Sequence, residues 1–458
     1  MTAEATGGSA GGSAGDEAAS VIGALYERIG ESAPRPRLAP TRRAVELLGD
    51  PQHMFGVIHI TGTNGKTSTA RMIDSLLRAH GLRTGLLTSP HLHRLNERIV
   101  VDGQEISDEA LVFNYRDIEP YLAIVDAELL ANGEPPLTFF EALTVLAFAA
   151  FADAPVDVAV LEVGMGGEWD STNVANADVA VLTPIGLDHV ERLGPTIADI
   201  AKTKAGIIKP ASRVVSAPQT DEAMTQIVAA AERDEAPVFV LGRDFDLESV
   251  TPGVGGQLLQ VRGTAASYPE VFLPLVGEHQ AMNAALAIAA VEQFLGGGDY
   301  PLATEVIEEG IGQATSPGRL EVLATRPSVL VDGAHNPHGA EALARALVQS
   351  FAFDRVIAVV GALREKDATG IIEQLDSVVD HFVVTQSHSE RALPVADLRD
   401  VVARVAGPER VSAYESFDEA MRAAREAAGP SDAVVVTGSL TLVAEAKEWV
   451  ADHEEGLL

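Results

Sequence analysis

The chain has 458 residues and a formal net charge of −33, from 33 Lys and Arg residues against 66 Asp and Glu residues. So acidic a chain lacks the basic face that releases counterions from phosphates, which excludes nucleic acid and anionic membrane surfaces as expected partners. It contains no cysteine, which excludes disulfides and thiolate metal sites and fits a cytoplasmic location. The most apolar stretch, 142–163, is interrupted by Asp153, Pro155 and Asp157, so we expect no membrane span.

Residues 1–17 are rich in Gly, Ser and Ala and are expected to form a flexible tail. After them, short Val- and Ile-rich runs recur between longer segments of helical periodicity. The runs lack the polar alternation of half-exposed strands, which predicts an α/β fold whose parallel strands are covered by helices on both faces. The predicted strands are 57–61, 156–163, 179–183, 214–217, 328–332, 356–361, 381–385 and 433–437. The predicted helices are 66–80, 140–151, 280–295, 339–350 and 417–428.

Two further segments indicate how the chain is divided. Between 239 and 275, short stretches interrupted by glycines predict a small antiparallel excursion. Near 313–318, the Ser-Pro-Gly sequence is typical of a connector. We therefore expect one domain over 18–313 and a second, smaller α/β domain over 314–458.

The sequence TGTNGKTS at 61–68 follows a predicted strand and precedes a predicted helix. Its glycines let backbone N–H groups face a phosphate, the helix N-terminus adds positive potential, and Lys66 supplies a full charge. Only two residues separate Gly62 from Gly65, so the G-x-x-x-x-G-K-[ST] pattern is not met. The motif predicts a nucleotide-phosphate site made of Gly62, Thr63, Asn64, Gly65, Lys66, Thr67 and Ser68. The alternative is a glycine-rich turn with a solvated lysine.

Two more polar residues follow predicted strands. Glu162 ends one apolar strand, and His189 lies shortly after another. Because the carboxyl ends of parallel strands line the ligand crevice of an open α/β sheet, Glu162 is well placed to hold Mg²⁺. His189 could be a metal ligand or a general base. The alternatives are a capping or ion-paired glutamate and a hydrogen-bonded loop histidine.

Taken together, the ordered motifs resemble the folylpolyglutamate synthase/dihydrofolate synthase family of the Mur ligase superfamily. The phosphate loop TGTNGKTS is similar to that of the whole superfamily. The matches to the folate branch are TSPHL (88–92), ERI (97–99), LTFFE (137–141), EVGMGG (162–167), GLDH (186–189), LGPT (193–196), KAGIIK (204–209), GEHQ (277–280), SPGRLE (316–321), DGAHNP (332–337), LREKD (363–367) and TGSL (437–440). They cover most of the chain from about residue 20 to 445.

The resemblance implies an N-terminal ATPase domain with a phosphate loop and a Rossmann-like C-terminal domain. It also implies that ATP phosphorylates a substrate carboxylate, and that L-glutamate then attacks the acyl phosphate. Lys66 would hold the ATP phosphates, and Ser89, Glu162 and His189 would bind two Mg²⁺ ions, with a carbamylated Lys204 as a further ligand. Arg319, Asn283 and Asp332 would contact the nucleotide, and Asp332 and His335 would face the site from the second domain. The folate substrate would lie near the 89–91 loop and the 169–170 turn.

Three positions depart from the family's usual residues: Glu168 replaces an arginine, Ser171 an alanine and Thr203 a glutamate. The resemblance further implies a monomer with a hinge near 316–319, acting on ATP, L-glutamate and dihydropteroate or reduced folates. Two alternative functions stay open at this point. One is a ligase of a cell-wall nucleotide precursor, although only about 55 residues precede the loop strand. The other is a nucleotide-binding protein without ligase chemistry.

Overall fold

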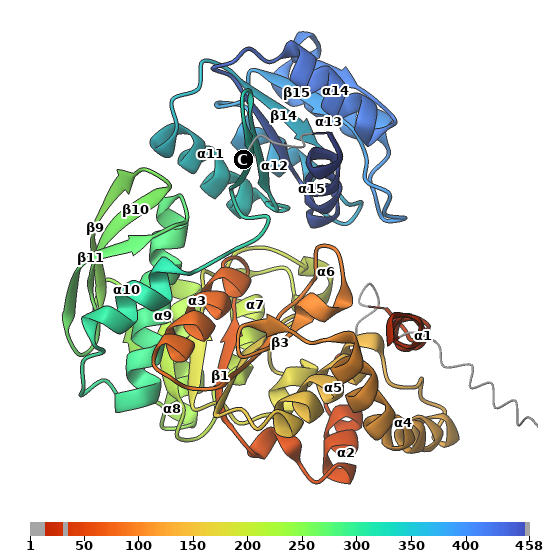
Figure 1. Ribbon diagram of the computed structural model, residues 1–458, viewed down its shortest axis with the longest axis vertical. Helices are drawn as coiled ribbons and strands as arrows, with labels where there is room; N and C mark the ends of the chain where they lie inside the picture. The colour runs from red at the N-terminus through yellow and green to blue at the C-terminus, as the bar shows by residue number, and fades with distance from the viewer. Residues whose placement is uncertain (1–13, 31–34, 454–458) are drawn as a thin grey trace, which may run out of the picture.

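The computed structural model describes residues 14–30 and 35–453, which form three sheets with helices packed around them (Figure 1). The eight-stranded sheet has the order β4-β3-β2-β5-β1-β6-β7-β8. Its strands are β1 (Gly56–Thr61), β2 (Thr84–Leu87), β3 (Ile99–Val101), β4 (Gln104–Glu105), β5 (Val158–Glu162), β6 (Val179–Leu182), β7 (Arg213–Ser216) and β8 (Val238–Val240). Neighbouring strands in the run β2-β5-β1-β6-β7-β8 pair parallel. At one edge of the sheet, β3 pairs antiparallel with both β2 and β4.

Helices cover both faces of this sheet because both faces of its central strands are apolar. Ile58 and Ile60 of β1 pack with α3 (Lys66–Ala79) and α9 (Glu278–Gly296) on one face. Val57 packs on the other face, with α5 (Phe139–Asp153). Around α5 lie α1 (Ala14–Tyr26), α2 (Ala39–Leu47) and α4 (Asp108–Ala131). The remaining helices near β6–β8 are α6 (Val190–Leu193), α7 (Ile197–Lys204) and α8 (Asp221–Arg233).

The predicted antiparallel excursion is a three-stranded sheet, β9 (Asp246–Gly253), β10 (Gly256–Arg262) and β11 (Ser267–Leu273), with β10 in the middle. It packs on α9 and α10 (Thr304–Gly312), which lie between it and the eight-stranded sheet (Figure 1).

The third sheet has six strands in the order β12-β13-β17-β14-β15-β16, and its β12 edge alone is antiparallel. The strands are β12 (Glu321–Thr325), β13 (Ser328–Asp332), β14 (Val356–Val360), β15 (His381–Val384), β16 (Val411–Ala413) and β17 (Ala433–Thr437). One face is covered by α11 (Pro337–Ser350), α12 (Ala368–Leu375) and α13 (Val395–Ala406), the other by α14 (Phe417–Ala427) and α15 (Leu440–His453). The α/β class predicted from the sequence is confirmed.

The eight predicted strands and five predicted helices are present with bounds within two residues of the expected ones. The prediction that residues 1–17 form a flexible tail is wrong for 14–17, because α1 begins at Ala14. Ala18, Val21 and Leu25 give α1 a buried apolar face that packs against α4. Residues 1–13 lie outside the described part. No helix within 14–30 or 35–453 is long and apolar enough to cross a membrane.

The topology brings two sheet edges together. The carboxyl ends of β1, β5 and β6 lead into the phosphate loop, Glu162 and the GLDH segment. The carboxyl ends of β13, β14 and β17 lead into the DGAHNP, LREKD and TGSL segments of the six-stranded sheet. Hydrogen bonds from Asn64 to Asn336 and from Lys366 to Asp188 join the two edges.

Candidate active site

The phosphate loop takes its shape from two glycines that no other residue could replace. Gly62 has φ +149°, and a Cβ there would overlap the hydroxyl of Thr183 on the neighbouring strand end. Gly65 has φ +86°, and a Cβ there would lie 2.6 Å from Oδ1 of Asn283. Both therefore need the small volume and left-handed freedom of glycine. Asn283, which was expected to contact the nucleotide, thus lies directly against the loop. It is buried on α9, and its amide donates to the side chain of Gln280 at 3.1 Å.

Lys66, the first residue of α3, is folded back over this loop. Its Nζ donates to the carbonyls of Gly62 and Thr63 at 3.2 and 3.3 Å. Burial lowers the pKa of Lys66, and the nearby carboxylates of Glu162 and Asp188 oppose that shift. The ammonium of Lys66 therefore lies against the phosphate loop, where a bound phosphate would be its natural counter-charge.

Glu162 ends β5 with only 1% of its surface exposed. The hydroxyl of Thr67 lies 2.9 and 3.0 Å from its two carboxylate oxygens, and the backbone N–H of Ser89 donates to it at 3.2 Å. Burial raises the pKa of Glu162, whereas Lys66 lowers it. Three sequence-predicted residues, Thr67, Ser89 and Glu162, are thus in contact, and they offer the hard oxygen ligands that Mg²⁺ prefers.

Lys204 ends α7 and reaches the same loop. Its Nζ donates to the carbonyl of Gly62 at 2.7 Å, and the residue is 5% exposed. Burial, with a smaller contribution from Lys66, lowers the pKa of Lys204 to about 7. A buried lysine of this kind has a large neutral fraction at physiological pH, which is the form that reacts with electrophiles. Thr203, the neighbouring residue that departs from the family's usual glutamate, donates its hydroxyl to the Asp199 carbonyl. Its own carbonyl accepts from the Glu168 N–H.

Asp188 joins the two sheets and was not singled out by the sequence reasoning. Nζ of Lys366 donates to it at 2.7 Å, with side chains only 7% and 10% exposed, and Nδ2 of Asn336 donates at 3.2 Å. His189 and His335 lie 3.8 and 3.7 Å from the same carboxylate. Burial alone would raise the pKa of Asp188, but Lys366 and the two histidines hold it below its ordinary value.

The two histidines predicted in the site therefore face each other across Asp188. His189 has φ +51° and lies just before α6 as its N-cap residue, and burial lowers its pKa to about 4. Nδ1 of His335 bonds the carbonyl of Gly333 at 2.8 Å, and burial lowers its pKa to about 3. Both rings are neutral at physiological pH, so each has a nitrogen lone pair that can accept a proton or bind a metal.

The tip of the phosphate loop also contacts the six-stranded sheet region directly. Asn64 and Asn336 form a reciprocal amide pair at 3.1 Å in each direction, and Nδ2 of Asn64 lies 2.8 Å from Nδ1 of His338. The hydroxyls of Ser68 and Ser316 are 2.7 Å apart. Asn336 also caps α11 by accepting from the Gly339 N–H at 2.8 Å. The position of the loop is thus set from both sheets.

Asp332 and Arg319 organise the connector beside the site. The carboxylate of Asp332 accepts from the N–H groups of Leu320 and Ala334, both at 2.8 Å. Burial raises the pKa of Asp332, and Arg319 opposes this shift. The guanidinium of Arg319 lies over Gly333, where a Cβ would overlap it. In this arrangement Asp332 holds the connector that carries Arg319.

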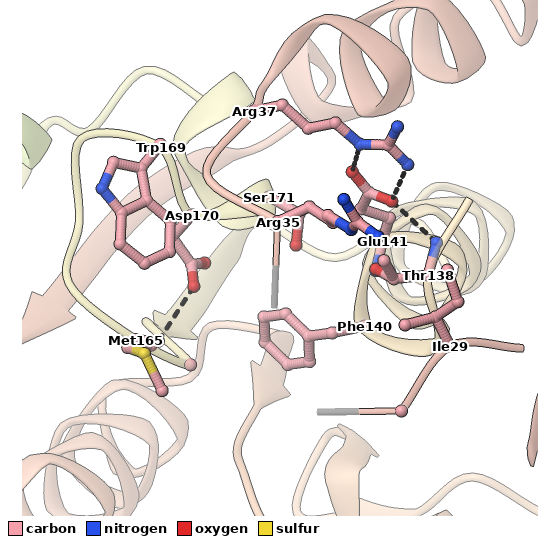
Figure 2. Close-up of a pocket in the computed structure, with 12 residues that line it drawn as sticks. Ile29, Arg35, Arg37, Thr138, Phe140, Glu141, Met165, Trp169, Asp170 and Ser171 are labelled. Carbon is pink, nitrogen blue, oxygen red and sulfur yellow. Dashed lines mark hydrogen bonds and ion pairs between the residues drawn. The ribbon is translucent and has the colours of Figure 1, made fainter. Parts of the chain in front are cut away.

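A separate pocket opens beside the 164–171 loop (Figure 2). Its lining joins apolar Phe140, Met165 and Trp169 with polar groups that include Asp170 and Ser171. The remaining lining residues are Ile29, Gly30, Arg35, Arg37, Thr138, Glu141 and Gly164. Glu168 lies outside this lining, as do Ser89 and His91, so of the two places expected for a folate it is the 169–170 turn that lines the pocket.

Within residues 14–30 and 35–453, no group of three or more His, Asp or Glu side chains is arranged to hold a metal. Sequence reasoning missed Asp188, Asn336 and Lys366, although each lies inside a motif it had quoted. Polar residues that follow successive predicted strands were the available sign that they belong to a site. The sequence could not show that Asp188 and Lys366 form an ion pair, because they are 178 positions apart.

Comparison with known proteins places this geometry among established structures. Residues 60–291 match the family model of the Mur ligase middle domain, and 318–440 match that of the Mur ligase glutamate ligase domain. The fold is therefore that of a Mur ligase.

Within that class, the chain is 44% identical over 458 residues to the dihydrofolate synthase/folylpolyglutamate synthase of Mycobacterium tuberculosis, covering 94% of each. It is 35% identical to the folylpolyglutamate synthase of Lacticaseibacillus casei, covering 90% of this chain and 95% of that protein. The M. tuberculosis folylpolyglutamate synthase complexed with ADP superposes with a TM-score of 0.91 at 42% identity, covering 95% of this chain and 99% of that one. The E. coli FolC complex with DHPP and ADP superposes with a TM-score of 0.83 at 29% identity, covering 97% and 100%. The chain belongs to the dihydrofolate synthase/folylpolyglutamate synthase family, as the sequence motifs indicated.

Proposed function

We propose that this protein is an ATP-dependent ligase that adds L-glutamate to dihydropteroate, to reduced folates, or to both. The observation that carries the proposal is the meeting of two sheet edges. One holds Lys66, the Thr67–Glu162 pair and Lys204, and the other brings His335, Asn336 and Lys366 against Asp188. Membership in the family and the ADP complexes of similar proteins support the same function.

ATP would bind with its phosphates on the loop of Gly62, Thr63, Asn64, Gly65, Lys66, Thr67 and Ser68. Lys66 would leave the Gly62 and Thr63 carbonyls and follow the γ-phosphoryl group, whose charge develops during transfer. Asn283, packed on Gly65, would lie toward the adenine, and Arg319 would contact the phosphates from the connector that Asp332 holds. These roles rest on the family resemblance and on the positions described above.

The chemistry of the donor set fits Mg²⁺. Thr67 and the buried Glu162 are hard oxygen ligands beside the phosphate loop, with Ser89 next to them and the neutral imidazole of His189 as a further ligand. Bound Mg²⁺ would neutralise the charge of the ATP phosphates. We also propose that Lys204 becomes carbamylated, because its pKa of about 7 leaves much of the amine neutral and able to add CO₂. The carbamate would supply an anionic oxygen ligand.

The reaction would take two steps. The substrate carboxylate first receives the γ-phosphoryl group of ATP, which converts an oxide leaving group into phosphate. The amine of L-glutamate then attacks this acyl phosphate, and an amide forms as phosphate leaves. His335 has a neutral ring facing Asp188, so it would help place the incoming glutamate and accept its proton. The folate ring system would occupy the pocket beside Trp169 and Asp170.

A two-domain organisation suits this chemistry, because closure would exclude water from the acyl phosphate. We place the boundary between the domains at 313–314, with a hinge at 316–319 between α10 and β12, so the first domain includes the whole of α1 from Ala14. The Ser68–Ser316 contact then lies at the hinge itself. A monomer in the cytoplasm stays the prediction.

The test is a substrate panel with purified protein, ATP, Mg²⁺ and L-glutamate. ADP and dihydrofolate should form with dihydropteroate, or ADP and an extended folate with tetrahydrofolate. Absence of ADP with both substrates would overturn the proposal. ADP release that needs no glutamate would instead favour a nucleotide-binding protein without ligase chemistry. Turnover of a uridine-diphosphate-linked precursor would favour a cell-wall ligase.

A further inference from the structure

Ser171 lines the pocket, and its hydroxyl proton has its direction fixed by a hydrogen bond to Thr144. Ser171 is buried and follows Asp170 at the start of a short 3-10 helix, Ser171–Val174. Its Oγ lies 2.8 Å from Oγ1 of Thr144, and Oγ1 of Thr144 donates to the carbonyl of Phe140 at 2.8 Å. This second bond is the common return of a helical threonine to the carbonyl four residues earlier in α5.

A threonine hydroxyl has one proton, and here the Phe140 carbonyl takes it because a carbonyl can only accept. The contact between Thr144 and Ser171 must then use the proton of Ser171. Within the described residues, the Ser171 hydroxyl makes no other hydrogen bond. Its oxygen is therefore left as an acceptor, with its proton turned away into the α5 side of the pocket wall.

The neighbouring carboxylate offers no such acceptor. Asp170 accepts from the Met165 N–H at 3.0 Å, from the Thr172 N–H at 3.0 Å and from the Thr172 hydroxyl at 2.5 Å. The Gly164 N–H further stabilises its charge. Four donors match the roughly four lone-pair positions of a carboxylate. Of the two adjacent polar side chains at this wall, drawn in Figure 2, Ser171 is therefore the one that keeps an unfilled acceptor.

We propose that Ser171 is a specificity-determining residue that accepts a hydrogen bond from an N–H group of the bound heteroaromatic ring, and that Thr144 positions its hydroxyl for this role. The inference rests on the proposed function, under which the ring is the pteridine of dihydropteroate or a reduced folate. Phe140, Met165 and Trp169 give the pocket apolar faces for a flat ring. A site built to accept an N–H rejects a ring that presents a lone pair there, because two acceptors would face each other.

The test is calorimetric titration of dihydropteroate into the protein with the non-hydrolysable analogue AMPPCP present, so that binding is measured without ligation. Ser171→Ala should weaken the binding of dihydropteroate by about three- to tenfold, the usual loss for one neutral hydrogen bond, and should leave the affinity for AMPPCP unchanged. Thr144→Val should weaken dihydropteroate in the same direction, because the Ser171 proton is then free to turn into the pocket. Thr144→Ser should restore it.

The matched control is Ser212→Ala. It removes another buried hydroxyl, which donates to the Ala177 carbonyl at 2.6 Å, and Ser212 does not line the pocket. It should bind dihydropteroate like the unchanged protein.

Dihydropteroate affinity within twofold in Ser171→Ala, or a parallel loss of AMPPCP affinity, would overturn the role of Ser171 and leave the ligase function standing. Failure of Thr144→Ser to restore binding would overturn the positioning role of Thr144. If the unchanged protein binds no dihydropteroate, this inference and the dihydropteroate branch of the proposed function fall together. Binding with the predicted pattern but no ADP release in the substrate panel would overturn the proposed function alone.

Discussion

The eight-stranded sheet and the contact between the two large sheets hold buried charge in different ways. Lys66 and Lys204, both on the eight-stranded side, donate to backbone carbonyls of the phosphate loop, and within the described residues no carboxylate lies within salt-bridge distance of either. Lys366, which comes from the six-stranded side, has a side chain only 7% exposed and pairs with Asp188 at 2.7 Å. The first arrangement leaves both lysines without a carboxylate partner in the described part of the chain, so Lys66 can meet an incoming anion, and Lys204, whose pKa burial lowers to about 7, can lose its proton. The second uses charge to join two parts of the protein, so it stabilises an arrangement of the sheets.

The largest effect is expected at Lys66, the unpaired charge on the phosphate loop. Lys66→Ala should lower the ligation rate by at least about 10² to 10³-fold, the loss seen when one transition-state donor is removed. The fold should survive, because the lysine has only carbonyl partners. ADP release and circular dichroism measure the two effects. Near-normal turnover would show that Lys66 does not serve the transferred phosphoryl group.

Lys204→Ala tests the second unpaired lysine. The rate should fall by about 10- to 100-fold or more, a loss typical when a group supporting a metal is removed. Acetate or another short carboxylate should restore part of the rate if an anionic oxygen at this position is what the site needs. The matched control is Lys202→Ala, two residues earlier and exposed, which should leave the rate unchanged. Equal losses in both variants would point to damage to α7 instead.

The paired charge predicts a different pattern. Asp188→Asn leaves Lys366 buried without its carboxylate, and should open the average arrangement of the two sheets and lower the ligation rate by about tenfold or more. Lys366→Met should do the same from the other side. The double variant should cost less than the sum of the two, because the pair acts as a unit. Small-angle scattering and the ligation rate measure this. Additive effects would mean that the pair does not join the sheets.

A smaller effect, the pH dependence of stability, is expected from a buried group that has no charged partner among the described residues. His59 on β1 is fully buried, and burial lowers its pKa to about 3 from an ordinary value of 6.5. Below pH 6.5 the unfolded chain protonates His59, whereas the folded protein keeps it neutral down to about pH 3. The contribution of His59 to the free energy of unfolding is therefore present above pH 6.5 and is lost as the pH falls toward 3. The slope from this group reaches about 1.4 kcal/mol per pH unit. Denaturation of His59→Gln at pH 7.5 and 5.5 should show a shallower loss than the unchanged protein. An equal slope would exclude this contribution.

The phosphate loop shows how far the sequence reaches. Its strand, its glycines and its lysine are adjacent in the chain, and the forces that shape them are local, so the motif at 61–68 was sufficient to predict the strand, loop and helix that the structure shows. The same holds for Glu162 at the end of β5. The longest helix of the described chain, α4 with 24 residues, was missed because Pro120 interrupts it and its apolar positions are scattered. Helix α1 was not among the predicted helices, because its small residues hid an apolar face that only packing reveals.

What the sequence determined by itself is therefore the α/β class, the phosphate loop, the strand-end glutamate and the family that the ordered motifs indicate. Only the tertiary structure decided that Asp188 pairs with Lys366 178 positions away, that burial brings the pKa of Lys204 to about 7, and that Thr144 turns the Ser171 proton away from the pocket. The reason is physical. Backbone conformation follows from neighbours in the chain, whereas the charge state of a side chain and the direction of its proton follow from neighbours in space, which the sequence does not specify.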